Sequence, residues 1–505
     1  MKFSVSRALI SVYDKTGLLD LAKFLISKEV EIVSSGGTAK YLEEHGIKVI
    51  KVESLTSFPE ILDGRVKTLN PKIHGAILAK RDNKEHLETL NKFEIKPIDL
   101  VIVNLYPFEK EQTLENIDIG GPCLIRSAAK NYESVAILVS PNQYKDFIEN
   151  FKNNELNLEN LKLYAKEAFK RTFNYDKEIY KYFNNENEPE NQSINLNKFQ
   201  DLRYGENPHQ KAILYKRDSQ DCPEILKSIQ QFSGKELSYN NWLDIDSAWS
   251  LISEFEAEIP ACVIIKHNIP CGVALGETIE QAYSYALDCD PLSAFGGIVA
   301  FNNIIDKNTA KKLKETFLEV IIATDFEVEA LDILKEKKNL RLIKMDLMPQ
   351  NLSFWQFKSI LGEGLLCQSF NSQLLNHDDL KVISEIQPDK EDWLSLLFAF
   401  KIVKHVKSNA IVIVNGNRTV GICGGQTSRI DAVKIALEKA SDLTNGAVLA
   451  SDAFFPFGDS VELCAQHKIK AIIQPGGSVR DQESIDMANK YKIAMVFTKI
   501  RHFKH

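Results

Sequence analysis

The sequence predicts an α/β protein built from two parts. Short apolar runs of four or five residues recur along the chain and end in glycine or polar residues, as strands of a buried sheet do. Apolar residues at helical spacing follow several of these runs, so strands and helices alternate. Residues 184–197 are rich in Asn and Glu and poor in apolar side chains, which is typical of an interdomain connection. We therefore expect domains over residues 1–185 and 198–505.

The length and composition are those of a globular protein with more than one domain. The chain has 505 residues, which is too long for one hydrophobic core, and its 44% hydrophobic and 26% charged content is ordinary for a globular protein. The formal net charge of −7 argues against bulk nucleic-acid binding, which requires a basic face. Any anionic ligand must therefore meet cations that are concentrated locally.

The cysteines and the N-terminus indicate a cellular setting. The eight cysteines form no CxxC pair, so in a chain of this length we expect reduced, mostly buried thiols and a cytoplasmic protein. Asp14 and Lys15 come too early for a signal peptide. No apolar run approaches the length that spans a bilayer, so we expect no membrane association.

The N-terminal part reads as a doubly wound domain. Strands are expected over residues 8–12, 30–33, 100–103 and 135–139, with a long helix over about 156–183. The second strand runs into Ser34-Ser35-Gly36-Gly37-Thr38, with a helix expected from Ala39 to His45. A strand, a glycine-rich turn and a helix together direct backbone N–H groups at a phosphate.

A basic loop strengthens the phosphate interpretation. Arg65, Lys67 and Lys72 lie within the twelve residues GRVKTLNPKIHG, and a later turn, IDIGGP, leads into a helix carrying Arg126 and Lys130. A solvated basic loop would explain the first of these equally well. Several strands that end in glycine or polar residues favour one anion-binding crevice at the edge of the sheet.

These motifs resemble a known family. SVYDKTG, SSGGT, GRVKTLNPKIHG, NLYPF and IDIGGPCLIRSAAKN resemble, in order, the inosine monophosphate (IMP) cyclohydrolase domain of the bifunctional purine biosynthesis family. The resemblance implies a fold like that of methylglyoxal synthase, a doubly wound sheet that binds phosphate. One residue departs from the family pattern, since Asn70 stands where the family usually has His.

The resemblance also implies roles for residues of this domain. Lys67, Tyr106 and Lys130 would transfer protons and stabilise charge, and Asp118 would lie beside the formyl group of the substrate. The implied binding residues, most of them for the phosphate, are Ser35, Gly36, Gly37, Thr38, Arg65, Thr68 and Asn104. Arginine with backbone N–H groups is the expected way to hold a phosphate.

In the C-terminal part, the stretch VIIKHNIPCGVA combines an apolar run with three polar residues. Its apolar run, 263–265, is expected to be a central strand that delivers Lys266, His267 and Asn268 at its tip, and Pro270 and Gly272 are expected to turn the chain. A lysine provides a fixed cation, and a histidine provides a base that titrates near neutral pH. Adjacent residues of a strand point to opposite faces, so the pair can converge only if the chain leaves strand geometry there. A surface turn after a core strand is the alternative for the tripeptide alone.

The pattern of the last third repeats this layout. Strands are expected over 298–301 and then over 410–414, 447–450, 470–474 and 493–497, with a helix over 431–440. Two passes of strand, polar turn and helix indicate two related α/β halves that face a shared cleft.

The C-terminal motifs resemble the second domain of the same family. RYGENPHQ, GKELSYNNWLD, IKHNIPCG, DPLSAFGG, KSNAIV, GGQTSRIDA, SDAFFPF, QPGGSVRD and RHFKH are similar to the formyltransferase that acts on 5-aminoimidazole-4-carboxamide ribonucleotide (AICAR). The resemblance implies two cytidine-deaminase-like halves and a homodimer with active sites across its interface. It also implies 10-formyltetrahydrofolate as a co-substrate, with no tightly bound cofactor and no metal.

By the same resemblance, His267 would be the general base of formyl transfer and Lys266 the stabiliser of the oxyanion. The implied binding residues are Arg203, Tyr204, Gly296, Glu319, Asn409, Arg429, Phe454 and Arg501. The expected products are the formylated ribonucleotide (FAICAR) and then IMP, made by dehydrative ring closure.

Two other classes of protein have less support in the sequence. A zinc nucleobase deaminase needs an H-x-E motif with P-C-x-x-C, but Pro270-Cys271 is followed by no second cysteine. A regulatory ligand-binding module would need the SGGT turn but not Lys67, Tyr106 and Lys130 together. The sequence therefore favours an enzyme.

Overall fold

The computed structural model describes residues 3–59, 61–184, 194–217, 224–349, 354–373, 375 and 379–505, apart from the Asp63 side chain. The chain divides into two compact units, Met1–Gln192 (unit 1) and Ser193–His505 (unit 2). Of the connection expected over 184–197, residues 185–193 lie outside the described part, and the first strand of unit 2 already begins at Leu196.

Unit 1 contains a five-stranded sheet in the order β3-β2-β1-β4-β5, and every neighbouring pair is parallel. Its strands are β1 (Arg7–Val12), β2 (Glu31–Ser34), β3 (Ile50–Lys51), β4 (Leu100–Asn104) and β5 (Ala136–Leu138). The order steps outward on both sides of β1, as in a doubly wound sheet, so the predicted fold class of the N-terminal part is confirmed.

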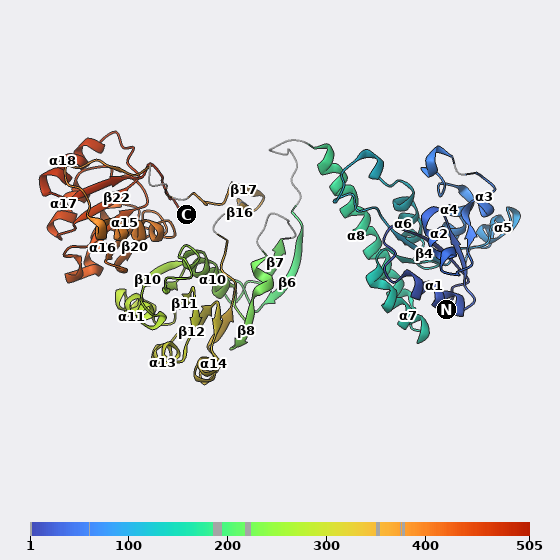
Figure 1. The fold of residues 1–505 in the computed structure, drawn as a ribbon, viewed down its shortest axis with the longest axis horizontal. Coiled ribbons are helices and arrows are strands. Elements are labelled where there is room, and N and C mark those ends of the chain that lie inside the picture. Colours follow the sequence, from blue (N-terminus) through green and yellow to red (C-terminus); the bar gives the residue numbers. More distant parts are fainter. Residues whose placement is uncertain are drawn as a thin grey trace. The chain divides into compact units, whose positions relative to one another are not determined.

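Within the described residues of unit 1, eight helices flank this sheet (Figure 1). They are α1 (Leu18–Ser27), α2 (Gly36–Glu44), α3 (Val52–Thr56), α4 (Pro71–Leu78), α5 (Lys84–Lys92), α6 (Gly120–Lys130), α7 (Tyr144–Lys152) and α8 (Leu158–Phe183), with short 3-10 turns at 62–64, 114–116 and 141–143. Helix α8 packs against α6 and β5. The helix predicted to start at Ala39 starts at Gly36 instead, so the two glycines form its first turn rather than a preceding loop.

Unit 2 is built on one sheet of twelve strands, in the order β18-β23-β22-β21-β19-β20-β10-β9-β11-β13-β15-β8. The strands of its first half are β8 (Gln230–Ser233), β9 (Ala261–Lys266), β10 (Ile269–Leu275), β11 (Ile298–Phe301), β13 (Val320–Ala323) and β15 (Arg341–Lys344). Those of its second half are β18 (Lys381–Val382), β19 (Ile411–Asn415), β20 (Arg418–Cys423), β21 (Val448–Ser451), β22 (Ala471–Gln474) and β23 (Ala494–Phe497).

The two halves have the same plan. In each, an antiparallel hairpin (β9–β10 or β19–β20) adjoins a parallel trio, β11-β13-β15 or β21-β22-β23. Both second hairpin strands carry a glycine under a helix. A Cβ on Gly272 would lie 1.8 Å from the Ala286 carbonyl oxygen, and one on Gly421 would lie 2.2 Å from that of Ala436. The predicted internal duplication is therefore confirmed.

The predicted cleft between the halves is wrong, because the halves join edge to edge. Strands β10 and β20 pair antiparallel in the middle of the sheet. The Thr419 hydroxyl accepts from the Val273 N–H at 2.9 Å and donates to the Val273 carbonyl at 3.1 Å, so a side chain extends the pairing.

Helices cover both faces of the twelve-stranded sheet. On one face, α10 (Tyr239–Ile252) and α15 (Lys390–Val403) bury a single core that includes strand residues from both halves. On the other face the core is divided in two. One part lies under α11 (Ile279–Cys289), α13 (Lys307–Glu315) and α14 (Val328–Lys335), and the other under α16 (Arg429–Ala440), α17 (Asp459–Gln466) and α18 (Asp481–Tyr491).

Smaller elements complete unit 2. They are the two-stranded sheets β6 (Leu196–Leu202) with β7 (Ala212–Arg217), β12 (Ile304–Ile305) with β14 (Asp325–Phe326) and β16 (Trp355–Ile360) with β17 (Gly364–Ser369), the helices α9 (Ile225–Ser228) and α12 (Pro291–Ala294), and a 3-10 turn at 441–444. The β6–β7 and β16–β17 ribbons expose large apolar side chains, among them Phe199, Tyr215, Trp355 and Leu366. Among the described residues, no helix is long and apolar enough to cross a membrane.

A buried ion cluster joins the two large helices of the shared core. Glu254, just after α10, accepts from Lys404 at 2.7 Å and contacts His405 Nε2 at 2.9 Å, both just beyond α15. All three side chains are at most 14% exposed. Burial alone would raise the pKa of Glu254, but the hydrogen bonds and charges of His405 and Lys404 lower it to about 2.

This cluster predicts how stability depends on pH. Because the folded pKa of Glu254 is below its unfolded value, the stabilisation is complete above about pH 4.5 and is lost as the pH falls toward 2. Glu254→Gln should lower the free energy of unfolding by about 3 kcal/mol at pH 7, with a smaller difference at pH 4 and below. Urea unfolding across this pH range measures it, with exposed Glu256→Gln as the control. A difference that stays constant down to pH 3 would contradict the assignment.

Candidate active sites

In unit 1, the segment Lys67-Thr68 lies between the N-termini of two helices. A Cβ on Gly36, the first residue of α2, would lie 2.5 Å from Lys67 Nζ. A Cβ on Gly120, the first residue of α6, would lie 2.6 Å from Thr68 Oγ1. Helix N-termini carry partial positive charge and unpaired N–H groups, so two of them beside an ammonium group form a site for an anion.

Asp118 brings a carboxyl group to the same place. Its Oδ1 accepts from the Gly121 N–H at 2.8 Å, and its own N–H donates to the Tyr175 hydroxyl at 2.7 Å. Burial raises the pKa of Asp118, and the Gly121 N–H and the Lys67 charge oppose that rise. A partly desolvated carboxyl group with a raised pKa, beside an ammonium group, is a candidate for proton transfer with a ligand.

The SSGGT segment behaves as predicted only in part. Ser35 is 3% exposed, and its hydroxyl has no hydrogen-bond partner within the described residues, which fits a position that a ligand oxygen would complete. The Thr38 hydroxyl, in contrast, accepts from the Val12 N–H and donates to the Val12 carbonyl, both at 3.0 Å. Thr38 therefore holds the end of β1 against α2.

Other predicted residues of unit 1 are held by their neighbours. Arg65 is exposed and paired with Glu115, with Nη2 2.5 Å from the carboxylate. The Asn104 side chain accepts from the Tyr13 and Asp14 N–H groups, at 2.7 and 2.9 Å, and so shapes the loop after β1. Tyr106 is half exposed, with its ring 5.1 Å from that of Tyr13.

Lys130 does not share this cluster. It is the last residue of α6, whereas Asp118 and Thr68 lie at the first turn of that helix. Eleven helical residues separate the two ends by about 15 Å. Unit 1 therefore brings Lys67 and Asp118 together and leaves the exposed Lys130 at the far end of the helix. Its catalytic role stays a prediction from resemblance.

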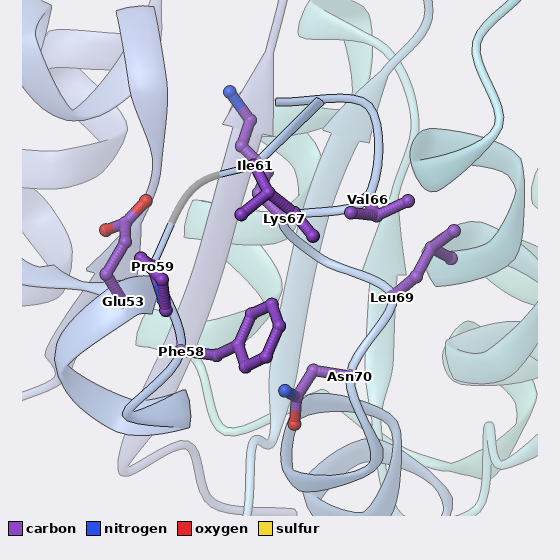
Figure 2. A pocket seen from close by; sticks show the side chains of 8 residues that line it. All are labelled: Glu53, Phe58, Pro59, Ile61, Val66, Lys67, Leu69 and Asn70. Atoms are coloured by element: carbon purple, nitrogen blue, oxygen red, sulfur yellow. The ribbon is translucent and has the colours of Figure 1, made fainter. Parts of the chain in front are cut away.

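Two cavities adjoin the predicted residues. One, of about 330 Å³, is lined by Lys67 and Asn70 together with Phe58, whose ring points into it (Figure 2). Asn70, the departure from the family pattern, caps α4 by accepting from the Lys72 N–H at 2.9 Å. The other cavity, of about 890 Å³, opens between the carboxyl ends of β1 and β4 and helix α8. Ligands bind at this edge of doubly wound sheets.

In unit 2, the chain turns at His267-Asn268. These two residues link β9 to β10, and both have positive φ, 52° and 62°. Two such residues make the tight turn that suits a hairpin. The prediction that Pro270 and Gly272 turn the chain is wrong, because both lie in β10, where the register of pairing shifts between them.

Strand β9 ends at Lys266, and His267 is the first residue of the turn. Ile265 belongs to the core under α10, so Lys266 belongs to the opposite face, where its ammonium group donates to the Phe295 carbonyl just after α12. His267 has left strand geometry and is exposed on the turn. A base and a cation thus occupy adjacent positions at the tip of β9.

A second group of predicted residues gathers near this tip. Glu319 accepts from Asn241 Nδ2 at 3.0 Å, and one of its oxygens lies 4.0 Å from Arg341 Nη1. The guanidinium of Arg203 lies over the Tyr204 ring at 5.7 Å, and burial lowers the pKa of Arg341, with Glu319 and Arg203 among the charges that act on it. Gly296 follows Phe295, and its N–H donates to the Phe317 carbonyl.

The predicted residues of the second half form their own group. Asn409 Nδ2 donates to the Gln426 carbonyl at 2.8 Å, and Phe454 and Arg501 are exposed. Arg429 was expected to bind substrate, but it is 8% exposed and forms an ion pair with the fully buried Asp452. Its guanidinium also donates to the Ala410 carbonyl and the Ser451 hydroxyl, so Arg429 braces β19 and β21.

The two groups share one edge of the twelve-stranded sheet. Three antiparallel pairings separate β9 from β19, so the end of β9 and the start of β19 lie on the same edge. Lys266, His267, Gly296 and Glu319 occupy it at β9, β11 and β13, and Asn409, Phe454 and Arg501 at β19, β21 and β23. The centres of the two groups are five to six strands apart, or about 25 Å.

Sequence reasoning missed some residues of these groups. Asn241 lies in the motif GKELSYNNWLD, which was recognised without a role for any member. Arg341 had no signal, because one arginine before an apolar strand is common. Within the described residues, no three His, Cys, Asp or Glu side chains gather in a way that could hold a metal ion. All seven cysteines of this part are free.

The fold and the clusters define a two-unit α/β enzyme whose cationic groups are placed to bind anionic small molecules. The family model of the AICARFT/IMPCHase bienzyme matches residues 128–439, and that of the MGS-like domain matches residues 17–133. The chain belongs to the AICARFT/IMPCHase bienzyme family.

Curated relatives agree over the whole length. The chain is 50% identical to the "Bifunctional purine biosynthesis protein PurH" of Clostridium botulinum strain Hall, with 99% of this chain and 100% of the relative covered. It is 47% identical to the protein of the same name from Ruminiclostridium cellulolyticum, with the same coverage. A solved structure titled "Crystal structure of ForH" is 30% identical over 35% of this chain and 96% of its own, with a TM-score of 0.33.

Proposed function

We propose that the chain catalyses the last two steps of IMP synthesis, formyl transfer from 10-formyltetrahydrofolate to AICAR and then ring closure of FAICAR to IMP. The carrying observation is the full-length match to bifunctional relatives at 50% identity. The separate clusters around Lys67 in unit 1 and His267 in unit 2 give each reaction its own residues.

Formyl transfer belongs to unit 2. The AICAR amine is a weak nucleophile because its lone pair is delocalised into the ring. As its nitrogen bonds to the formyl carbon, its proton passes to His267, and the positive charge of Lys266 stabilises the oxyanion. The bond from the formyl carbon to the folate nitrogen then breaks, and the proton goes to that nitrogen. No tightly bound cofactor is needed, because the folate enters and leaves as a co-substrate.

Ring closure belongs to unit 1. The carboxamide nitrogen of FAICAR attacks the formyl carbon of the same molecule, so the protein mainly has to orient the chain and stabilise the charge on the formyl oxygen. Lys67 supplies the cation, and Asp118 is placed to accept and return protons as water leaves. The N-termini of α2 and α6 and the Ser35 hydroxyl would hold the phosphate.

A direct assay tests the function. Purified protein is mixed with AICAR and 10-formyltetrahydrofolate, and tetrahydrofolate and IMP are followed separately. Both should appear, and supplied FAICAR should give IMP without folate. If neither product forms, the proposed function is wrong for this chain.

A homodimer follows from the distribution of residues in unit 2. His267 and Asn409 lie at the ends of strands three apart, or about 14 Å, and the centres of their two groups lie about 25 Å apart, so one copy spreads these residues along the sheet edge and does not gather them around one AICAR molecule. A second copy that places its Asn409 group opposite the His267 group would complete each site. The exposed apolar ribbons β6–β7 and β16–β17 provide surface for such contact. We place this dimer in the cytoplasm.

Mixing two inactive variants tests the shared site. His267→Ala and Asn409→Ala should each lose most formyl transfer, by about 10²-fold or more. In a shared site, heterodimers formed after mild dissociation and remixing contain one site with both residues intact. Activity should then return to about a quarter of wild type, because half of the dimers carry one good site in two. Each variant remixed with itself is the control, and absence of recovery in confirmed heterodimers would contradict a site shared between copies.

A further inference from the structure

Helix α10 presents one polar face to the turn that carries His267. Asn241, Asp244 and Ser247 are spaced three residues apart, so their side chains lie on the same face of the helix. The helix begins at a capping box, in which the Ser238 hydroxyl accepts from the Asn241 N–H and Asn241 accepts from the Ser238 N–H, both at 3.1 Å. This cap fixes the helix end from which the three side chains project.

Each of the three side chains contacts the formyl-transfer site. Asp244 Oδ1 accepts from the Asn268 N–H at 2.7 Å, and the Ser247 hydroxyl donates to Asn268 Oδ1 at 3.1 Å. Asn241 Nδ2 donates to Glu319 at 3.0 Å. The turn is therefore held from α10 through Asn268, in addition to the Lys266–Ile269 pairing that closes the hairpin.

Building on the proposed function, we propose that Asp244 is the positioning residue for His267, holding the turn through Asn268 and stabilising the imidazolium that forms when His267 takes the proton of the AICAR amine. A histidine that accepts a proton during catalysis is generally oriented by a third group, and a carboxylate does this best.

The surroundings of Asp244 agree with this role. The side chain is partly buried. Burial raises the pKa of Asp244, and the Asn268 N–H, the charge of His267 and the His267 N–H oppose that rise. Glu319 is the other charged group that acts on it, and it raises the same pKa. The Asp244 carboxylate therefore interacts with the charge of His267, and Glu319 is a second carboxylate nearby.

The Asp244→Asn variant tests the negative charge of Asp244 separately from the hydrogen bond that this side chain accepts. The asparagine oxygen can still accept from the Asn268 N–H, so the turn should keep its geometry while the negative charge is lost. We expect kcat of formyl transfer to fall about 10-fold, which is less than the 10²–10⁴-fold that the general base itself contributes, with KM for AICAR changed less than threefold. Asp306→Asn is the matched control, since Asp306 caps α13 by accepting from the Thr309 N–H at 2.7 Å at the opposite edge of the sheet.

A double-variant cycle distinguishes positioning from general damage. If Asp244 acts through His267, Asp244→Asn should cost little further activity in a His267→Ala background. The proposal would be overturned if the double variant lost activity by the product of the two single losses. It would also be overturned if Asp244→Asn alone kept the wild-type kcat. If Asp244→Asn folds poorly, Ser247→Ala tests how α10 holds the turn. This variant removes only the 3.1 Å hydrogen bond to Asn268 and should lower kcat less. Wild-type formyl transfer in the same preparation separates failure of this inference from failure of the proposed function.

Discussion

His267→Ala is expected to lower formyl transfer by 10²–10⁴-fold while supplied FAICAR still closes to IMP. The reason is that, in the proposed reaction, His267 takes the proton of a weakly nucleophilic amine, and water cannot replace a positioned base. The structure places His267 on an exposed turn of unit 2, in the compact unit that does not contain Lys67, so its loss should leave unit 1 intact.

The measurement follows tetrahydrofolate release from AICAR and 10-formyltetrahydrofolate, alongside IMP formation from FAICAR. His467→Ala provides a control, because His467 follows α17 and lies at the opposite edge of the sheet. If His267→Ala also stops ring closure in a folded protein, the assignment of the two reactions to separate units fails.

Lys67→Ala should have the reverse effect. Removing the ammonium group that lies between the N-termini of α2 and α6 takes away a cation from the oxygen that gains charge during ring closure. Loss of one such group typically raises the barrier by about 2.7–4 kcal/mol, or 10²–10³-fold in rate. Formyl transfer, measured by tetrahydrofolate release, should remain near wild type.

Lys40→Ala is the matched control for Lys67→Ala. It removes one positive charge from the exposed face of α2, where Lys40 pairs weakly with Glu44 at 3.9 Å. Ring closure should change by less than twofold in that variant. Equal loss in both variants would mean that overall charge, rather than the place of Lys67, sets the rate.

Much of the fold was predictable because its strands are apolar and bounded by turn residues. The strand over 298–301 is confirmed by β11, and the helix expected over about 156–183 is α8. Periodicity gives such elements directly, since buried strands and long amphipathic helices have distinct patterns. How strands pair is a different matter, because the β10–β20 pairing joins residues almost 150 positions apart through ordinary backbone bonds. That pairing is why one sheet replaced the expected cleft.

Site residues were predictable by type more than by geometry. The hairpin turn fell at His267-Asn268 because β10 tolerates Pro270 through a shift in register, and proline and glycine alone pointed two residues too far. Arg429 looked like a ligand-binding arginine, yet its partner Asp452 comes 23 residues later and is buried with it. The distance of Lys130 from Asp118 depends on where α6 starts. The helix starts beside Asp118, whose carboxylate accepts from the Gly121 N–H, and this leaves Lys130 at the opposite end.

The Val273–Thr419 contact at the centre of unit 2 has a mechanical consequence. Hydrogen bonds join β10 to β20, and a single hydrophobic core lies against both halves. The two duplicated halves therefore cannot open and close about a hinge between them. The duplication has therefore produced one continuous sheet, with the predicted site residues along one of its edges.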